Sequence, residues 1–181
     1  MKFKTFIQIY YSHRLAKASS FKKFYLNLTL PFIYLLNKFY YPKIKNLDHF
    51  SINHEYLFHK DLNYLFQYFN SDKGDFYINQ YQKPAKRESK LIPGHSYNHF
   101  YDKYFKKKKL QYLNILELGS FRGNAAAALF FYFKNAQIWC GDIFPDLFTY
   151  KSKRIKNFLI DTSSELELKN KIINKDENFD F

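Results

Sequence analysis

Cysteine is nearly absent from this chain: among its 181 residues there is one, Cys140. A single cysteine excludes a disulfide within the chain and a cysteine-based metal cluster. Because Cys140 lies in an apolar run beside Gly141, we expect a small buried side chain rather than a reactive thiol. The chain also lacks an apolar run of the roughly 18–20 residues that cross a bilayer, and its first apolar run is too short and too polar for a signal peptide. We therefore expect a cytoplasmic protein.

Acidic residues are also scarce, since 16 Asp and Glu face 29 Lys and Arg and give a net charge of +13. The imbalance is concentrated in residues 1–45, which contain nine basic residues and no acidic one. The remaining 136 residues contain 20 basic and 16 acidic residues. A local positive field of this kind favours contact with anionic membranes or nucleic acid. This field belongs to the N-terminal segment and not to the motifs described below.

An uncharged stretch of 14 residues, 24–37, lies inside the basic segment and is flanked by Lys22, Lys23 and Lys38. We expect Pro31 to interrupt this stretch, which is in any case too short to span a bilayer. Two interpretations stay open: a segment that lies in a membrane interface, or an accessory helix that packs on the core. The first predicts weak peripheral membrane contact through residues 1–45.

The chain divides by composition into three parts. They are the basic, aromatic segment 1–45, a helical lead-in over 46–110 that contains a loop at 71–96, and an α/β part over 111–181. Within the lead-in, residues 56–69 have the apolar spacing of a helix. The loop begins with a turn at the SDKG sequence, where the helical pattern breaks.

A second helix is expected over residues 95–105. His95 and His99 share one of its faces, but no third ligand accompanies them, so we expect no metal site. Lys106–Lys109 follow at the end of this helix, where positive charge suits the helix dipole and a solvated face is the simplest interpretation. Because this run is short and lacks an aromatic platform, nucleic-acid binding is not expected.

The most informative stretch is residues 113–133, which predicts a buried strand, a glycine turn and a helix. The apolar run Ile115–Leu118 is short and ends at a glycine, which favours a strand. The turn has the pattern E-x-G-x-x-x-G, formed by Glu117, Gly119 and Gly123. Four alanines, the best helix formers, come next. Such a turn lets a polar or negatively charged ligand approach the backbone at the start of a helix.

A second predicted strand, residues 136–142, ends at Asp142, which follows Gly123 by 19 residues. In a βαβ unit that binds a nucleotide, an acid at about this distance accepts hydrogen bonds from the ribose hydroxyls. The glycine spacing helps to identify the nucleotide. A dinucleotide fold has G-x-G-x-x-G, whereas here residue 121 is a phenylalanine, which is unfavourable for close approach of a pyrophosphate.

A third strand over 155–161 and a helix over 164–173, with Ser163 or Ser164 as its N-cap, complete the pattern. Right-handed crossovers place the three strands in one parallel sheet. The expected fold class is α/β: a partial Rossmann-like parallel sheet of about three strands with flanking helices, preceded by a helical, basic and aromatic N-terminal segment.

The motifs together resemble a known family. ELGSFRG at 117–123 and the strand IWCGDIFPD at 138–146 are similar to the S-adenosylmethionine site of class I methyltransferases. More narrowly, SDKG at 71–74 and HSYNHFY at 95–101 resemble bacterial sugar and macrolide O-methyltransferases. The resemblance covers roughly residues 71–181.

The resemblance implies a role for each matching position in binding S-adenosyl-L-methionine. Glu117, Gly119 and Gly123 would shape the methionine end of the pocket, with Ser120 among them, and Asp142 would bind the ribose. The other implied residues are Ile143 against the adenine, Asp161 and Thr162 near the adenine edge, and Asp72, His95 and Tyr97 at the cofactor mouth or the substrate.

In the resembled family, a hydroxyl of a sugar or another small acceptor attacks the methyl group after activation by a downstream base, often with a divalent cation. No catalytic residue can be named in this sequence, and a metal requirement is not indicated. Phe179–Asp180 resembles the start of the fourth of seven strands, beside a sheet edge that we expect to be open. The sequence therefore predicts an incomplete methyltransferase without turnover.

Two other functions stay open. The first is a non-enzymatic fragment that binds a membrane surface or a partner through residues 1–45. The second is another Rossmann-like enzyme that binds a different nucleotide, such as a nicotinamide cofactor.

Overall fold

The computed structural model describes residues 2–9, 18–40, 44–78, 90–174 and 178–181. They form two compact units, Met1–Lys43 and Ile44–Phe181, which we describe separately. The described helices of the first unit are α1 (Phe3–Ile9) and α2 (Ser20–Tyr40).

Helix α2 is one continuous helix of 21 residues, although Pro31 lies inside it. The expected interruption at Pro31 is therefore wrong, because a proline removes one backbone hydrogen bond but keeps a φ compatible with a helix. Helix α1 covers one side of α2, where the ring of Tyr34 lies 5.1 Å from that of Phe3 and 5.4 Å from that of Phe6. No helix in the described part of the chain has the length and apolar character needed to cross a membrane.

The second unit is built around a parallel sheet of three strands in the order β4 (Asn114–Leu118), β5 (Gln137–Asp142) and β7 (Ile155–Leu159). Leu118 pairs with Gly141 and Asp142 pairs with Leu159, so the carboxyl ends of the strands meet at one edge. The α/β class and the parallel arrangement of these three strands are confirmed.

Shorter elements surround this sheet. Strands β1 (Lys45–Asn46) and β6 (Tyr150–Lys151) form a parallel pair, and β2 (Phe76–Ile78) and β3 (Leu91–Pro93) form an antiparallel pair. The described helices of this unit are α3 (Leu47–Ile52), η2 (Glu55–His59), α4 (Leu62–Tyr68), α5 (Tyr97–Phe105), η4 (Lys106–Lys108), α6 (Asn124–Tyr132), η5 (Pro145–Leu147), α7 (Glu165–Leu168) and η6 (Lys169–Ile173).

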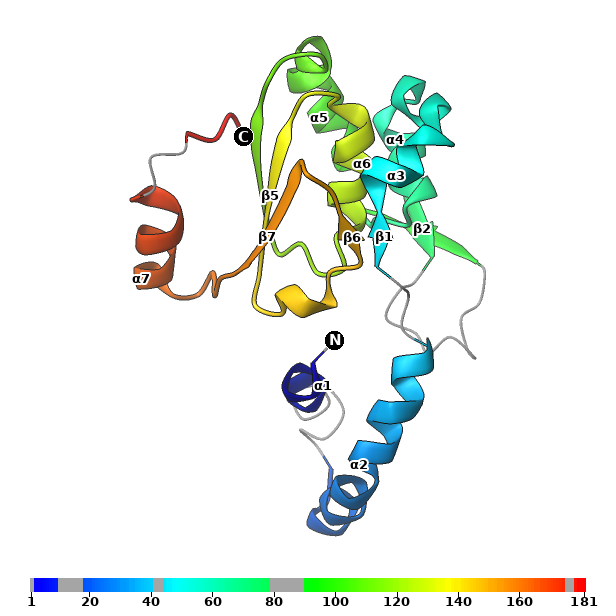
Figure 1. The fold of residues 1–181 in the computed structure, drawn as a ribbon, viewed down its shortest axis with the longest axis vertical. Coiled ribbons are helices and arrows are strands. Elements are labelled where there is room, and N and C mark those ends of the chain that lie inside the picture. The colour runs from blue at the N-terminus through cyan, green and yellow to red at the C-terminus, as the bar shows by residue number, and fades with distance from the viewer. Residues whose placement is uncertain (1, 10–17, 41–43, 79–89, 175–177) are drawn as a thin grey trace. The chain divides into compact units, whose positions relative to one another are not determined.

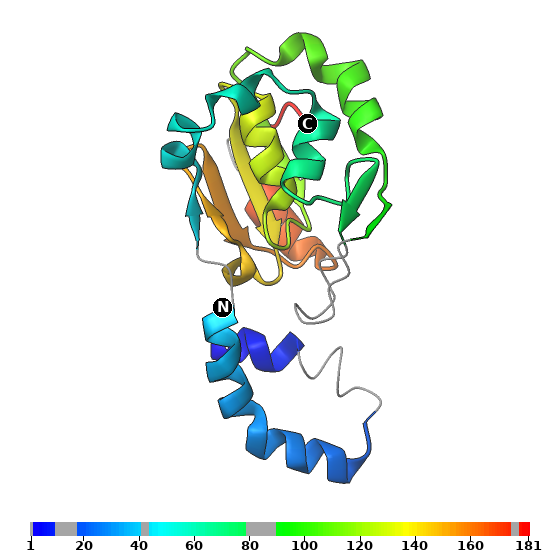
Figure 2. The ribbon, with the colours of Figure 1, turned by 90° about the vertical axis from the view of Figure 1, so that its right-hand side faces the viewer.

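Helices α4 and α6 lie on one side of the three-stranded sheet and α7 lies on the other (Figures 1 and 2). The alanines of α6, Ala125–Ala128, are at most 4% exposed, because α6 is enclosed by the sheet and by α4. Leu65 and Phe66 of α4 belong to the same core as Ile115 and Ile138 of the sheet. The lead-in thus contributes directly to the core that supports the edge described below.

Two expectations about the lead-in need correction. The helical pattern over 56–69 is divided between η2 and α4, because Asp61 caps α4 by accepting a hydrogen bond from the Tyr64 amide. The loop expected over 71–96 contains the β2–β3 pair, whose strands have three residues each and one of which ends at a proline. Strands this short give no alternating pattern that a sequence can reveal. Residues 79–89 of that loop lie outside the described residues.

The edge of β4 that faces away from β5 is partly covered. The Asp180 amide donates to the Asn114 carbonyl at 2.8 Å, and the Leu116 amide donates to the Phe181 carbonyl at 2.8 Å. The Phe181 ring stacks on Phe105 with a centroid distance of 3.8 Å. The expectation of an open edge is therefore wrong along residues 114–116, because the chain itself pairs there.

Arg154 fixes the end of α6. Its guanidinium donates to the carbonyls of Phe130 and Phe133 at 2.8 Å and of Ala136 at 3.3 Å, and it lies 3.8 Å from the centre of the Phe130 ring. Burial lowers the pKa of Arg154 to about 10, so it keeps its charge at neutral pH. Phe130 lies in the last turn of α6 and Phe133 is its C-cap, so their carbonyls belong to the helix end, where intrahelical donors run out.

We expect Arg154→Met to lower the free energy of unfolding by about 2–4 kcal/mol, because three bonds to a charged donor are lost. Urea denaturation measures the change. Lys153→Met is the matched control, since Lys153 is exposed, and it should stay within about 0.5 kcal/mol of the parent. Equal stability of the two variants would show that the carbonyls of α6 do not need the guanidinium.

Candidate functional site

The carboxyl edge of the three-stranded sheet is where the topology favours a ligand. Strands β5 and β7 lie on one side of β4, whereas residues 180–181 pair with its other side. The direction in which the chain adds strands therefore reverses at β4. In open parallel sheets, ligands bind beyond the carboxyl ends of the strands at such a reversal. The segment that leaves β4 at this point is the glycine loop, residues 119–123.

The glycine loop is anchored at both ends. At its start, the Gly119 amide donates to the Gly141 carbonyl at 2.8 Å, and the buried Ser120 hydroxyl donates to the Glu117 carbonyl at 3.0 Å. At its end, the Arg122 carbonyl accepts from the amide and the hydroxyl of Thr149 at 3.0 and 2.9 Å. Ser120 therefore has a structural partner at the end of β4.

The two glycines of the loop have different surroundings. Both have φ of +78°, a backbone conformation that other residues adopt at a cost. A Cβ added at Gly119 would meet no atom within 4 Å, whereas a Cβ at Gly123 would lie 2.4 Å from the ring of Phe148. Gly119 thus leaves open space over the backbone, and Gly123 is needed for internal packing.

Asp142 joins the end of β5 to the glycine loop. One carboxylate oxygen accepts from the Phe121 amide at 2.7 Å, and the other accepts from the Phe144 amide at 2.8 Å. Phe121 has φ of +47°, so the first of these bonds stabilises a backbone conformation that is uncommon for a bulky residue. A carboxylate oxygen can accept two hydrogen bonds, so Asp142 keeps capacity for a ligand.

Glu117 is a buried acid near the carboxyl end of β4, two residues before Gly119. It is 7% exposed, and its Oε1 lies 3.1 Å from Nζ of Lys73. Its Oε2 is buried and has no hydrogen-bond partner among the described residues. A buried carboxylate oxygen without a donor is costly, so this atom is an available acceptor for a donor group of a ligand.

The ion pair alters the titration of both groups. Burial raises the pKa of Glu117, and the positive charge of Lys73 opposes that shift without cancelling it. Burial lowers the pKa of Lys73, but the charge of Glu117 and its hydrogen bond to Lys73, together with Asp72 and Tyr101, outweigh burial and leave the pKa raised. A buried acid beside a lysine at the end of a strand is the kind of perturbed pair found at functional sites.

Lys73 is held in place by the turn Ser71–Gly74. The amide of His95 donates to the Asp72 carbonyl at 2.7 Å, and the amide of Tyr97 donates to the Lys73 carbonyl at 2.8 Å. A Cβ at Gly94 would lie 2.1 Å from the Gly74 carbonyl oxygen, so only glycine allows these two segments to approach. The SDKG turn and the start of α5 therefore position the lysine as one unit.

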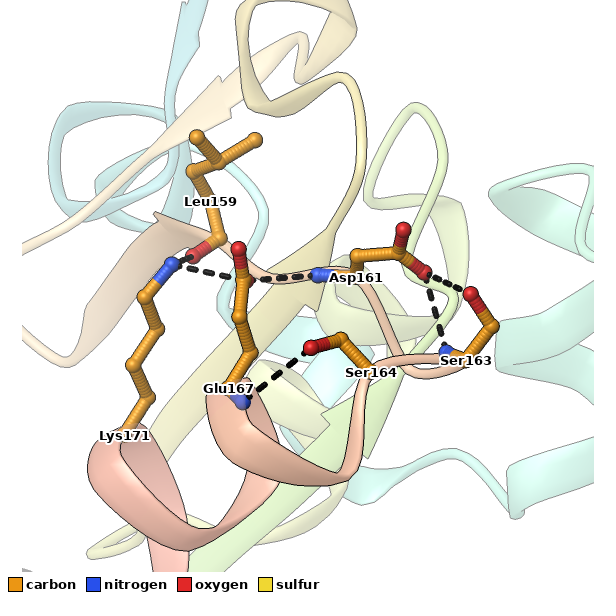
Figure 3. A network of polar contacts seen from close by, with 6 residues as sticks. All are labelled: Leu159, Asp161, Ser163, Ser164, Glu167 and Lys171. Atoms are coloured by element: carbon orange, nitrogen blue, oxygen red, sulfur yellow. Dashed lines mark hydrogen bonds and ion pairs between the residues drawn. The ribbon is translucent and has the colours of Figure 1, made fainter.

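The other sequence-predicted residues at the sheet edge are less closely joined to this group. Ile143 is 50% exposed after Asp142, and Thr162 is also exposed. Figure 3 shows Asp161 turned toward Ser163, whose amide and hydroxyl donate to one carboxylate oxygen at 2.9 and 2.6 Å. These hydrogen bonds lower the pKa of Asp161. Asp161 thus stabilises the turn before α7, whose N-cap is Ser164.

Asp72, His95 and Tyr97 lie together at the turn that holds Lys73. Nε2 of His95 lies 3.8 Å from the Asp72 carboxylate, and the His95 ring stacks on Tyr97 with a centroid distance of 5.4 Å. His99 lies 3.2 Å from the Asp75 carboxylate. Within the described ranges, no group of three or more His, Cys, Asp and Glu side chains is close enough to hold a metal ion.

Sequence reasoning missed Lys73 and the backbone of Phe121. Lys73 is 44 positions before Glu117 in the chain, and a lysine in a turn is normally a solvated residue. The signal for this position is the SDKG sequence, whose resemblance to the methyltransferases pointed to Asp72 and not to Lys73. Phe121 contributes a main-chain amide, which no side-chain pattern reveals.

A basic cavity lies at the opposite, amino-terminal edge of the sheet. It has a volume of about 430 Å³ and is lined by Phe58, His59, Lys106, Lys107, Lys109, Leu110, Tyr132 and Lys134. Lys109 precedes β4 and Lys134 precedes β5, so this cavity is separate from the glycine loop. Burial lowers the pKa of Lys109, and the neighbouring lysines contribute to the shift.

Comparison with known proteins does not identify a family. No protein-family model matches the sequence, and no curated protein matches it.

Proposed function

We propose that the second unit binds S-adenosyl-L-methionine and serves a methyltransferase that acts on a hydroxyl of a sugar or another small acceptor. The observation that carries this proposal is the hydrogen bond between the Asp142 carboxylate and the Phe121 amide. It joins the acid that ends one strand to the glycine loop that follows the neighbouring strand, which is the juxtaposition that an adenosyl group with a charged tail requires.

The residues at this edge fit the chemical groups of the cofactor. Asp142 offers acceptors to a ribose diol. Gly119 leaves its backbone open to the tail, and the unpartnered Oε2 of Glu117 offers an acceptor to the methionine ammonium. Lys73, paired with Glu117, would contact the methionine carboxylate through a charge-assisted hydrogen bond. These assignments use only groups that converge on the glycine loop.

The same loop is less suited to a dinucleotide. The second glycine of the dinucleotide motif lets the backbone approach the pyrophosphate. Here Phe121 occupies that position and brings a large side chain with it. An enzyme that uses a nicotinamide cofactor is therefore the less favoured candidate. A binding measurement with each cofactor distinguishes it from the methyltransferase.

When bound, the cofactor would supply an electrophilic methyl group on its sulfonium. The residues of this chain would bind and orient it, and we assign none of them as the base that activates the acceptor. We propose a cytoplasmic location for this activity, because the buried Cys140 is the only thiol in the sequence.

Isothermal titration with S-adenosylhomocysteine and, separately, with NAD tests the proposal. We expect S-adenosylhomocysteine to bind and NAD to give no heat. Gly119→Ala should weaken binding at least tenfold, because its methyl group projects into the open space over the loop. Leu110→Ala, at the opposite edge of the sheet and 67% exposed, is the control and should bind as the parent does.

The outcomes distinguish the candidates. Binding of NAD alone would favour a nicotinamide enzyme. Absence of binding to either compound by a folded protein, verified by circular dichroism, would remove nucleotide binding at this edge and favour a non-enzymatic role.

A further inference from the structure

Helix α2 presents a continuous apolar stripe to solvent. Its residues are between 54% and 82% exposed and comprise Phe21, Phe24, Tyr25, Leu28, Phe32, Leu35 and Leu36. At 3.6 residues per turn, these positions fall within an arc of about 120°. Large contiguous apolar surfaces of this kind mark interaction sites, whereas single exposed apolar residues are ordinary.

The stripe is not the face that holds the first unit together. Leu30 is 2% exposed and Phe6 of α1 is 5% exposed, and the ring of Tyr34 contacts Phe3 and Phe6. By helical spacing, Leu30 and Tyr34 lie on the side of α2 away from Leu28 and Leu35. Helix α2 therefore has two apolar sides, of which α1 covers one.

The charge of the segment selects the occupant of the uncovered side. Residues 1–45 contain nine basic residues and no acidic one. Lys22 and Lys23 are the second and third residues after the start of α2, and Lys22 is exposed. A basic segment next to an apolar helical stripe is complementary to a bilayer whose headgroups are anionic, and each lysine near such a surface adds to the attraction.

We propose that α2 lies flat on an anionic lipid bilayer, with its apolar stripe inserted at the boundary between headgroups and acyl chains. Among the described helices none is suited to cross a membrane, so α2 would lie in the interface rather than span it. The stripe consists of three Phe, one Tyr and three Leu, and Phe and Leu are typical of the apolar face of helices that lie in a membrane interface. This inference does not depend on the cofactor proposed for the second unit.

Co-sedimentation of the full chain with vesicles tests the inference. We expect binding to vesicles of phosphatidylcholine with about 30 mol% phosphatidylglycerol, and much weaker binding to phosphatidylcholine alone. Raising the salt from about 0.05 M to about 0.5 M should weaken the binding to anionic vesicles, because the lysine contribution is screened. Leu28→Glu combined with Leu35→Glu should reduce the binding at least tenfold.

The matched control is Ile52→Glu combined with Leu110→Glu, two residues of the second unit that are 73% and 67% exposed. It removes two exposed apolar side chains and adds the same charge, so it should bind within about twofold of the parent if the stripe is responsible. Equal loss in both double variants would show that net charge alone decides binding and would overturn the inference.

Two further results would also overturn it. The first is absence of binding to anionic vesicles at low salt by the folded parent chain. The second concerns the variant Leu28→Glu with Leu35→Glu measured without vesicles. If its oligomeric state differs from that of the parent, or its melting temperature is much lower, and the parent does not bind vesicles, the inference is wrong. That result would assign the stripe to a second copy of the chain or to a contact within it.

Discussion

Gly123→Ala should lower the free energy of unfolding of the second unit by about 4 kcal/mol. Two terms contribute: an L-residue at φ of +78°, and a methyl carbon 2.4 Å from the ring of Phe148. Phe148 is 7% exposed, so its ring cannot turn into solvent without leaving the core. Chemical denaturation followed by circular dichroism measures the change.

Gly119→Ala separates the two terms, because Gly119 has the same φ but no atom within 4 Å of its added methyl carbon. It should cost about 1–2 kcal/mol, the backbone term alone. Combining Gly123→Ala with Phe148→Leu should restore part of the loss, because the smaller side chain can give way. Equal destabilisation by both alanine variants would show that Phe148 moves freely.

Lys73→Met should destabilise the second unit by about 3–5 kcal/mol at neutral pH, because it leaves the buried Glu117 carboxylate without a counter-charge. Methionine keeps most of the length of the aliphatic stem, so packing changes little. Adding Glu117→Leu should return the stability to within about 1–2 kcal/mol of the parent, since an apolar pair replaces the ions.

The pH dependence of Lys73→Met follows from the raised pKa of Glu117, which burial causes. The folded state holds the proton on Glu117 more tightly than the unfolded state does, so the charged carboxylate costs stability as the pH rises above its ordinary pKa of 4.5. The destabilisation should therefore be smallest below that value, where Glu117 is protonated in both states, and should grow toward neutral pH.

In the parent chain, the stabilisation from the Lys73–Glu117 ion pair should be lost at high pH. Burial lowers the pKa of Lys73, but Glu117 together with Asp72 and Tyr101 outweighs it, so the pKa is raised. The stabilisation from the pair is therefore complete below the ordinary lysine value of 10.5 and is lost as the pH rises through the raised value. A pH-independent difference between the parent and Lys73→Met would contradict both arguments.

The sheet, and the proximity of Asp142 to the glycine loop, could be predicted from the sequence. Strands β4 and β5 are buried apolar runs ended by small or polar residues, and parallel strands bring their carboxyl ends to one edge. Pattern and topology alone therefore locate the carboxylate within reach of residues 119–123.

Features that depend on contacts between distant segments could not be predicted in this way. Lys73 reaches Glu117 from a turn that is packed against the segment before α5, where Gly94 allows the close approach. Strands β2 and β3 owe their existence to pairing with each other rather than to any alternation of their own. Helix α2 continues through Pro31, which propensity alone would place at a boundary.

The double anchoring of Asp142 by the amides of Phe121 and Phe144 has a consequence for selectivity. A carboxylate held at both oxygens cannot rotate to follow a ligand, so it acts as a rigid template for a vicinal diol. If the adenosyl group binds here, its 2′-deoxy and 3′-deoxy analogues should each lose affinity independently, because neither hydroxyl can be compensated by reorientation of the acid.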